Sequence, residues 1–135
     1  MPYTHEVYPQ LKIAQVTASS DINLAESIRV MYDVARDSRF KPSYGLLLDL
    51  RLSTFTPTLL ESYQLARTLR ELRHSYKGPM AIVVSNTLHF GIARMIASFV
   101  EAEGLTLFAF QDFEEAKLWL DQHIPSLPLS AHSLK

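Results

Sequence analysis

The sequence predicts an α/β protein whose sheet is mixed but mostly parallel, with five strands and about four helices in the order β-β-α-β-α-β-α-β-α. Two observations lead to this prediction. The apolar runs at 46–50 and 80–84 are short and almost continuous, as is typical of strands buried on both faces of a parallel sheet. Each run is followed by polar residues and then by a longer stretch whose apolar side chains recur at helical spacing. Strands that alternate with helices in this way indicate parallel pairing with right-handed crossovers.

The first two elements are predicted to be strands over 3–8 and 11–17, joined by a tight hairpin at Pro9-Gln10. In the second strand, Ala14 and Val16 share one face. Because a short turn joins the two strands, we expect the first to run antiparallel to the second.

A helix is predicted over 23–39, since its apolar side chains recur at spacings of three and four residues. Asn23 and Glu26, three residues apart, form a capping box, and Ser20 and Asp21 are alternative caps.

The strand at 46–50 is followed by a predicted helix from Pro57 to about 76. Thr56 is the expected N-cap, and Pro57 stands at the first helical position, where its missing N–H costs nothing. Gly78 follows the helix and suits the left-handed conformation that often terminates one.

The remaining elements repeat the pattern of strand, polar turn and helix. They are the strand at 80–84, a helix from the cap Ser85-Asn86-Thr87 to Glu103 with Gly104 after it, a strand over 105–110, and a helix over 113–122 capped by Asp112 and Glu115. The core stripe of the 87–103 helix is expected to hold Leu88, Ile92, Met95, Ile96 and Phe99.

Length and composition indicate one globular domain. A chain of 135 residues fits a single core, which we place at 1–123. Residues 124–135 contain two prolines and no sustained period, so they are expected to form a loosely ordered C-terminal tail.

Composition also excludes several classes of function. The net charge of −1 gives no reason to expect nucleic acid or an anionic membrane as a partner. Cysteine is absent, which removes disulfides, thiolate catalysis and cysteine metal sites. The five histidines lack metal-ligand spacing, so no metal is expected. With no signal peptide and no apolar run long enough to cross a membrane, we expect a cytoplasmic protein.

Polar side chains gather where three predicted parallel strands end, and these ends should lie along one rim of the sheet. The residues after the three strands are Asp49, Arg51, Ser53, Thr54 and Thr56; Ser85, Asn86, Thr87 and His89; and Gln111 and Asp112. Turns and helix caps use the same residue types, so two interpretations stay open: capping alone, or a functional rim that includes helix N-termini suited to an anion.

Three residues near this rim have specific alternatives. Asp49 either positions the following loop as a charge or ends the strand at the surface, and Arg51 is its obvious partner. His89 is a surface residue of a first helical turn unless a carboxylate and a nucleophile lie within reach. Arg94 flanks the core stripe, either as a snorkelling or salt-bridging side chain or as an anion ligand.

Three segments resemble the SpoIIAA-like proteins, which are relatives of the STAS domain and are similar in topology to lipid-binding CRAL-TRIO (Sec14-type) domains. The segments read YGLLLDLRLSTFTP, KGPMAIVVSNTLHFGIARMIASF and LFAFQDFEEAKLWL and cover roughly half of the chain. They resemble the uncharacterised bacterial branch more than the sporulation proteins. In the anti-sigma factor antagonists of this fold, a partner kinase phosphorylates a serine that follows the central strand. The resemblance implies Ser53 as the nearest positional equivalent, with Thr54 and Thr56 as alternatives.

The sequence therefore predicts a non-enzymatic regulatory or protein-interaction domain, with a switch at the loop after the central strand as one option. The alternative is a carrier of a small apolar, lipid-like ligand, implied by the Sec14-type resemblance. For the carrier, a set of aromatic residues either lines a cleft or simply fills the core: Phe40, Tyr44, Phe55, Tyr63 and Phe90. A third class, hydrolase or transferase, rests only on Ser53, His89 and Asp112 sharing a rim. We expect a protein partner, leave a homodimer open, and expect no cofactor.

Overall fold

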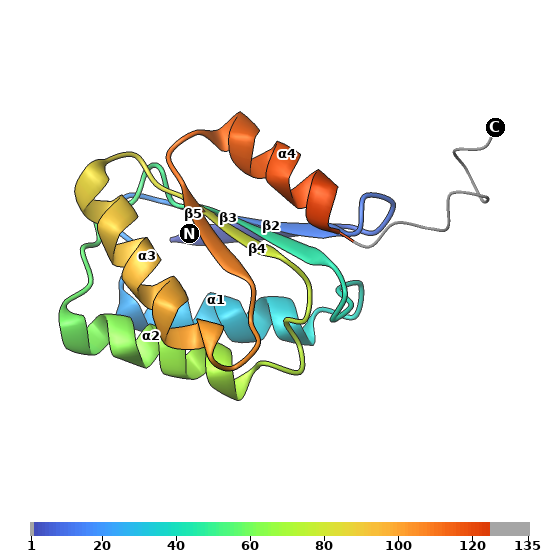
Figure 1. The fold of residues 1–135 in the computed structure, drawn as a ribbon, viewed down its shortest axis with the longest axis horizontal. Helices are drawn as coiled ribbons and strands as arrows, with labels where there is room; N and C mark the ends of the chain where they lie inside the picture. Colours follow the sequence, from blue (N-terminus) through green and yellow to red (C-terminus); the bar gives the residue numbers. More distant parts are fainter. Residues whose placement is uncertain (1, 125–135) are drawn as a thin grey trace.

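The computed structural model describes residues 2–124 and confirms the predicted order of elements (Figure 1). The strands are β1 (Tyr3–Tyr8), β2 (Ile13–Ala18), β3 (Gly45–Asp49), β4 (Met80–Val83) and β5 (Leu107–Phe110). The helices are α1 (Leu24–Arg36), α2 (Leu59–Glu71), α3 (Thr87–Glu101) and α4 (Phe113–His123). Of the predicted tail, Ile124 packs against a core cluster, and 125–135 lie outside the described residues.

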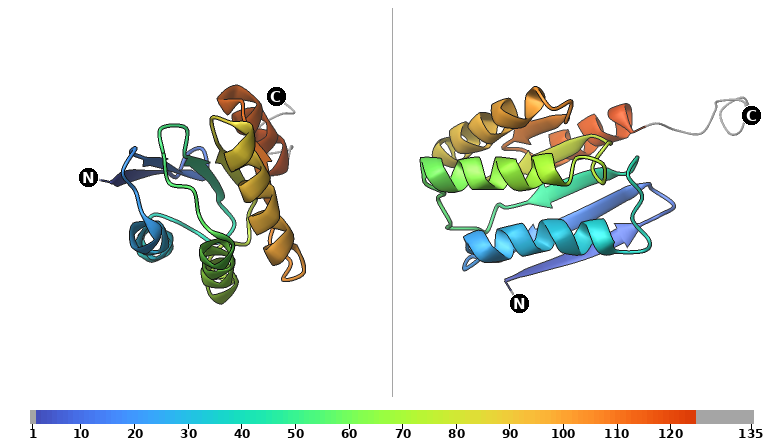
Figure 2. Two further views of the ribbon diagram at one scale, coloured as in Figure 1. Left: turned by 90° about the vertical axis from the view of Figure 1, so that its left-hand side faces the viewer. Right: turned by 90° about the horizontal axis from the view of Figure 1, so that it is seen from below.

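The sheet has the strand order β1-β2-β3-β4-β5. β1 runs antiparallel to β2, and β2 to β5 run parallel to one another, so the sheet is mixed and mostly parallel as predicted. Figures 1 and 2 show α1, α2 and α3 on one face of the sheet and α4 on the other. This arrangement brings the carboxyl ends of β3, β4 and β5 to one rim, where α2, α3 and α4 begin.

Two apolar clusters hold the layers together. The larger one lies between the sheet and the three helices, and α1 contributes Val30 and Val34 to it. The smaller one joins Leu47, Ala81 and Val83 of the sheet to Ala116 and Leu120 of α4. Each large side chain that is fully buried stabilises the fold by roughly 1.5–3 kcal/mol.

Reciprocal hydrogen bonds set the starts of the first two helices. The Asn23 box of α1 is confirmed: Asn23 Oδ1 accepts from the Glu26 N–H at 2.9 Å, and Glu26 Oε1 accepts from the Asn23 N–H at 3.2 Å. The predicted Thr56 cap of α2 is wrong, because Thr58 and Glu61 form the same reciprocal pair at 3.1 and 2.9 Å. A cap at Thr58 satisfies two backbone N–H groups, those of Thr58 and Glu61, whereas a cap at Thr56 would satisfy only one.

Helix α3 is rotated relative to its predicted core stripe. Ala93, Ile96 and Val100 are its buried residues, whereas Leu88 is 62% and Phe99 38% exposed. Ile96 is therefore buried as predicted, whereas the small Ala93, which the predicted stripe did not include, is buried and Leu88 and Phe99 remain at the surface.

The two glycines that follow helices have different roles from one another. Gly104 has φ = +82° after α3, the left-handed conformation that ends a helix. Gly78 does not adopt it, so that prediction is wrong; instead, a Cβ at Gly78 would lie 2.3 Å from the backbone oxygen of Tyr44. Gly78 is required for close packing of two backbone segments.

No helix among residues 2–124 is both long and apolar enough to cross a lipid bilayer.

Candidate functional site

The loop between β3 and α2, residues 50–58, lies across the rim and is attached at both sides. The backbone N–H and the Oγ1 of Thr54 both donate to the carbonyl of Ser20, at 3.2 and 2.7 Å. Thr56 Oγ1 lies 2.8 Å from Nε2 of His89, in the first turn of α3. The loop therefore connects the segment before α1 with the start of α3.

A cavity of about 110 Å³ lies beneath this loop, between the sheet and the three helices. Its wall is mostly apolar: the sheet contributes Val16, Leu48 and Ile82, and the helices contribute Val30, Leu65 and Ile96. Phe55 and Pro57 of the loop also line it. An apolar cavity of about 150 Å³ stays dry and binds a benzene-sized molecule, so a void of this size and lining favours a small apolar occupant over water.

Few polar groups reach the cavity. Ser53 is 9% exposed, and its Oγ accepts a hydrogen bond from the Phe55 N–H at 3.1 Å. The His89 ring contacts Thr56 through Nε2, and its Nδ1 lies 3.5 Å from the Asn86 amide. Ser53 and His89 both line the cavity where the loop covers it. They could hold one polar group of a bound molecule.

Asn86 is the N-cap of α3, because its Oδ1 accepts from the His89 backbone N–H at 2.8 Å. This bond fixes the first turn of α3, from which the His89 ring reaches Thr56. Within the described residues, the hydrogen-bonding partners of the His89 ring are thus a hydroxyl and an amide, and neither is a carboxylate.

Asp49 and Arg51 form an ion pair at the exit of β3. Arg51 Nε and Nη2 donate to the two carboxylate oxygens at 2.9 and 2.8 Å, and the Arg51 backbone N–H donates to Asp49 Oδ1 at 3.2 Å. Asp49 is buried, so the exposed strand end is excluded and the pairing with Arg51 is confirmed. Burial raises the pKa of the Asp49 carboxyl, but the hydrogen bonds from Arg51 outweigh it and hold the pKa below its usual value.

This ion pair lies on the α4 side of the sheet, apart from the cavity. The Arg51 guanidinium is 4.4 Å from the ring centre of Phe113, in the first turn of α4. Neither Asp49 nor Arg51 lines the cavity. The Asp49–Arg51 ion pair instead holds the beginning of the loop against α4.

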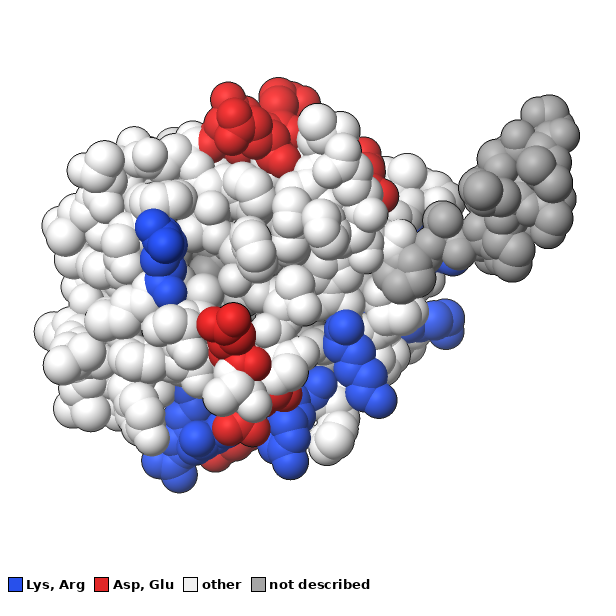
Figure 3. Space-filling view, viewed as in Figure 1, with Lys and Arg blue, Asp and Glu red and all other residues white. Residues whose placement is uncertain are grey.

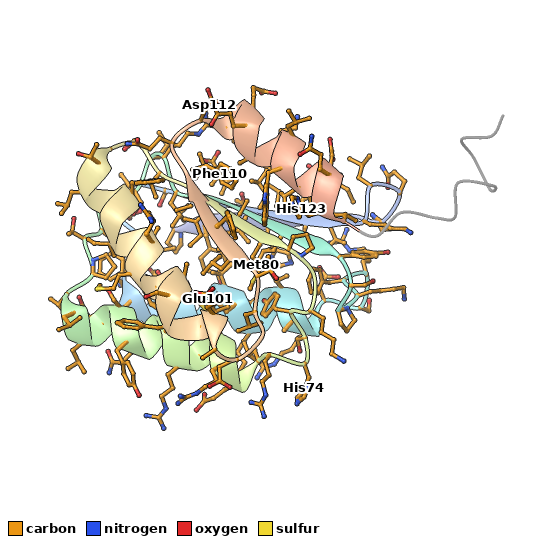
Figure 4. The ribbon with its side chains drawn as sticks, in the orientation of Figure 1. His74, Met80, Glu101, Phe110, Asp112 and His123 are labelled. Atoms are coloured by element: carbon orange, nitrogen blue, oxygen red, sulfur yellow. The ribbon has the colours of Figure 1, made fainter. Side chains whose placement is uncertain are left out.

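Asp112 and Arg94, the other predicted rim residues, do not line the cavity either. Asp112 is the N-cap of α4, with its Oδ1 accepting from the Glu115 N–H at 3.0 Å, and Figure 4 shows Asp112 and Phe110 at that end of β5. Arg94 lies beside the Phe90 ring in a second groove. The structure therefore brings together Ser53, Thr54, Thr56, Asn86 and His89, and places Asp49, Arg51, Arg94 and Asp112 elsewhere.

The cavity is in line with the alternative of a cleft for an apolar ligand, but its mostly aliphatic lining was not predicted. Of the five aromatic residues considered for a cleft, Phe55 lines it, and Phe40 and Tyr44 pack edge to face in the core at 5.9 Å. Tyr63 is exposed, and Phe90 lines the second groove. The signal present in the sequence was a small residue on an inward helix face: Ala93 in α3 leaves the space that a larger side chain would fill.

No family model matches the sequence, and no curated protein matches it. Among solved structures, the fold is similar to that of an uncharacterized protein of the DUF3478 family with a SpoIIAA-like fold, from Shewanella loihica PV-4. The two chains share 15% sequence identity, the match covers 80% of this chain and 83% of that chain, and the TM-score is 0.56. This likeness shows the fold and confirms the SpoIIAA-like resemblance at that level.

Proposed function

We propose that this SpoIIAA-like domain is a non-enzymatic binding protein that holds a small, largely apolar molecule beneath the 50–58 loop. The observation that carries the proposal is the cavity of about 110 Å³, which is lined by three helices, the sheet and the loop. Concave, mostly apolar sites with few polar groups are the usual form of small-molecule sites.

The lining defines the chemistry of the ligand. An aliphatic or aromatic body of about benzene size would contact Leu48, Ile82 and Ile96. A single hydroxyl or similar polar group at one end could bond to Ser53 or His89. Charged ligands are disfavoured, because no Lys, Arg, Asp or Glu within residues 2–124 lines the cavity.

The test uses toluene and 1-hexanol as probes, with thermal unfolding as the readout. A molecule that binds the folded state raises the melting temperature as its concentration increases. Ala93→Leu fills the cavity and should abolish this rise. Ala97→Leu is the matched control, since Ala97 is on the same helix but lines the other groove. The Ala97→Leu variant should still show the rise in melting temperature.

Two results would argue against the proposal. One is the absence of any shift with either probe at saturation. The other is an equal shift in the Ala93→Leu variant, which would place binding elsewhere. Native mass spectrometry after gentle purification adds an independent readout, because a co-purifying apolar molecule should be lost in Ala93→Leu.

Exposed apolar side chains favour a second candidate function, a regulatory protein-interaction domain. They belong to the loop and to the neighbouring helices α2 and α3: Leu52, Leu59, Leu60, Tyr63, Leu88 and Phe99. Tyr63 and Phe99 pack edge to face at 6.0 Å, so these two helices share one exposed aromatic contact. Apolar groups gathered at a surface are typical of interaction sites.

A phosphorylation switch at the loop would couple the two candidates. Ser53 is buried, whereas Thr54 and Thr56 are exposed, so the threonines are the accessible acceptors. A phosphate on Thr56 would add a charge of about −1.5 to −2 and replace the hydroxyl that now contacts His89. Intact-mass analysis of native protein, before and after incubation with cellular kinases, tests the switch. If no phosphate is found on this loop under any condition, the proposed switch is wrong.

A further inference from the structure

The two edges of the sheet differ in how they are protected. On the β1 edge, His5 lies 3.0 Å from Asp37, and Glu6 forms an ion pair with Arg39 at 3.1 Å. Charged side chains of this kind hinder an edge strand from pairing with another chain.

The β5 edge has no such protection among the described residues. β5 pairs with β4 alone, and its sequence Leu-Phe-Ala-Phe contains no charge and no proline. Phe108 is 54% exposed. β5 is in front in Figure 1, and Figure 3, in the same orientation, shows a largely uncharged surface over α3 and β5.

The backbone of β5 has hydrogen-bonding groups to offer on its open side. The carbonyls of Thr106 and Phe110 accept from β4 and the residue after it, at 2.8 and 2.9 Å. Because successive residues of a strand direct their backbone groups to opposite sides, Leu107 and Ala109 present theirs to the open side.

Apolar surface flanks this edge on both faces. On the α3 side lies a groove of about 560 Å³, whose lining includes Phe90, Ala97, Leu107 and Ala109. On the α4 side, Phe108 stacks on Trp119 with ring centres 4.9 Å apart. A strand added to β5 would therefore find apolar contacts for side chains on both of its faces.

The charges in the groove indicate which strand fits. Arg94 and Glu101 both line it, and neither has an ion-pair partner within residues 2–124. They are two helical turns apart, about 10 Å along α3. Figure 4 shows Glu101 toward the end of α3 that is far from Asp112 and the rim. A two-fold rotation that pairs β5 with its own copy in antiparallel orientation brings Arg94 of each protomer toward Glu101 of the other.

We propose that two copies of this chain associate through antiparallel β5–β5 pairing, with reciprocal Arg94–Glu101 ion pairs between the α3 helices. The two sheets then form one continuous sheet, and Phe108 lies at the centre of the interface. The same patch serves on both protomers, as a two-fold interface requires. This inference is independent of the proposed ligand and concerns a different surface of the molecule.

The experiment measures molar mass by sedimentation equilibrium from about 1 µM to about 1 mM protein, a range that covers weak homodimers. Arg94→Glu and Glu101→Arg each place like charges opposite one another twice per dimer, and each should weaken the dimer about tenfold. The double variant Arg94→Glu/Glu101→Arg restores opposite charges and should return the dissociation constant to near the wild-type value. Lys41→Glu, a charge reversal at an exposed loop residue, is the control and should have no effect.

Phe108→Lys provides a second test, since a lysine at the centre of the interface should abolish the dimer. Circular dichroism shows whether each variant is folded. If Phe108→Lys does not fold, the charge variants alone test the proposed dimer. In the wild type, hydrogen exchange at the amides of Leu107 and Ala109 should slow as protein concentration rises. A monomer across the whole range, or a dimer that neither charge reversal weakens, would overturn the proposal.

Discussion

Thr56 Oγ1 lies 2.8 Å from Nε2 of His89, and this hydrogen bond joins the loop after β3 to the first turn of α3. Together with the bonds from Thr54 to the Ser20 carbonyl, it holds the loop over the cavity. Both hydrogen bonds are exposed, so breaking them leaves no buried polar group without a partner. A covered cavity with a weakly attached cover suits a site that must both enclose and release its occupant.

Replacing Thr56 by valine should loosen the loop while leaving the domain folded. The lost hydrogen bond is exposed, so the free energy of unfolding should fall by no more than about 1 kcal/mol. Hydrogen exchange measured by mass spectrometry should become faster for residues 51–57. Thr4→Val, at an exposed position of β1, is the control and should leave exchange in the loop unchanged. Unaltered exchange in Thr56→Val would mean that this bond does not hold the loop.

Arg51→Met should destabilise the protein more than its surface position suggests. It keeps an apolar stem against Phe113 but leaves the buried Asp49 carboxylate without its partner, at a cost of about 1–3 kcal/mol. The double variant Asp49→Asn/Arg51→Met should recover part of the loss, since no buried charge remains. Urea unfolding of the wild type, the two single variants Asp49→Asn and Arg51→Met, and the double variant measures the coupling. A double variant less stable than Arg51→Met would contradict this account.

Stability should decrease in acid, in part because of Asp37. Hydrogen bonds from the Arg39 side chain and backbone, together with His5, hold the pKa of the Asp37 carboxyl far below its usual value. A carboxyl whose pKa is lowered in the folded state contributes stability above the unfolded pKa of about 4, and this contribution is lost as the pH falls below it. Asp49, whose pKa is also lowered, acts in the same direction.

The pH dependence of the free energy of unfolding should therefore be less steep between about pH 5 and pH 2 in Asp37→Asn than in the wild type. Asp121→Asn, at an exposed position of α4, is the control and should keep the wild-type slope. Equal slopes in all three proteins would show that Asp37 is not part of the acid response.

Two glycine-to-alanine variants should have opposite effects on stability. Gly91 is exposed within α3, and a Cβ there meets nothing within 4 Å, so Gly91→Ala should stabilise by about 1 kcal/mol. Gly78→Ala places a Cβ against the Tyr44 backbone and should destabilise by about 2–3 kcal/mol. Differential scanning calorimetry measures both. A rise in melting temperature for Gly78→Ala would contradict the close approach of the two backbones.

Local patterns were sufficient to predict the order of elements and the direction of the strands. Continuous apolar runs marked β3 and β4, and the pairs Asn23–Glu26 and Asp112–Glu115 located two helix starts. The start of α2 was misplaced because the chain offers two threonines, and Thr56-Pro57 looks as good a start as Thr58 until the reciprocal bond with Glu61 is considered.

The candidate site was predictable only in part, since it depends on distances between separate elements. Parallel strands explain why Ser53 and His89 share a rim, and both line the cavity. The rotation of α3, which turns Ala93 inward and Leu88 outward, results from packing against the sheet and α2. The small Ala93 on this inward face is a sign of the cavity, but the size and lining of the cavity depend on side chains from the sheet and from three helices.

The ion pairs along β1 limit how far this molecule could assemble. A sheet that is open at both sides can extend without end, and fibres grow in that way. Here Arg39, paired with Glu6 and Asp37, closes one side with charge. Any growth by strand addition at β5 therefore stops after a single step, so that the bare edge favours a closed pair and not a filament.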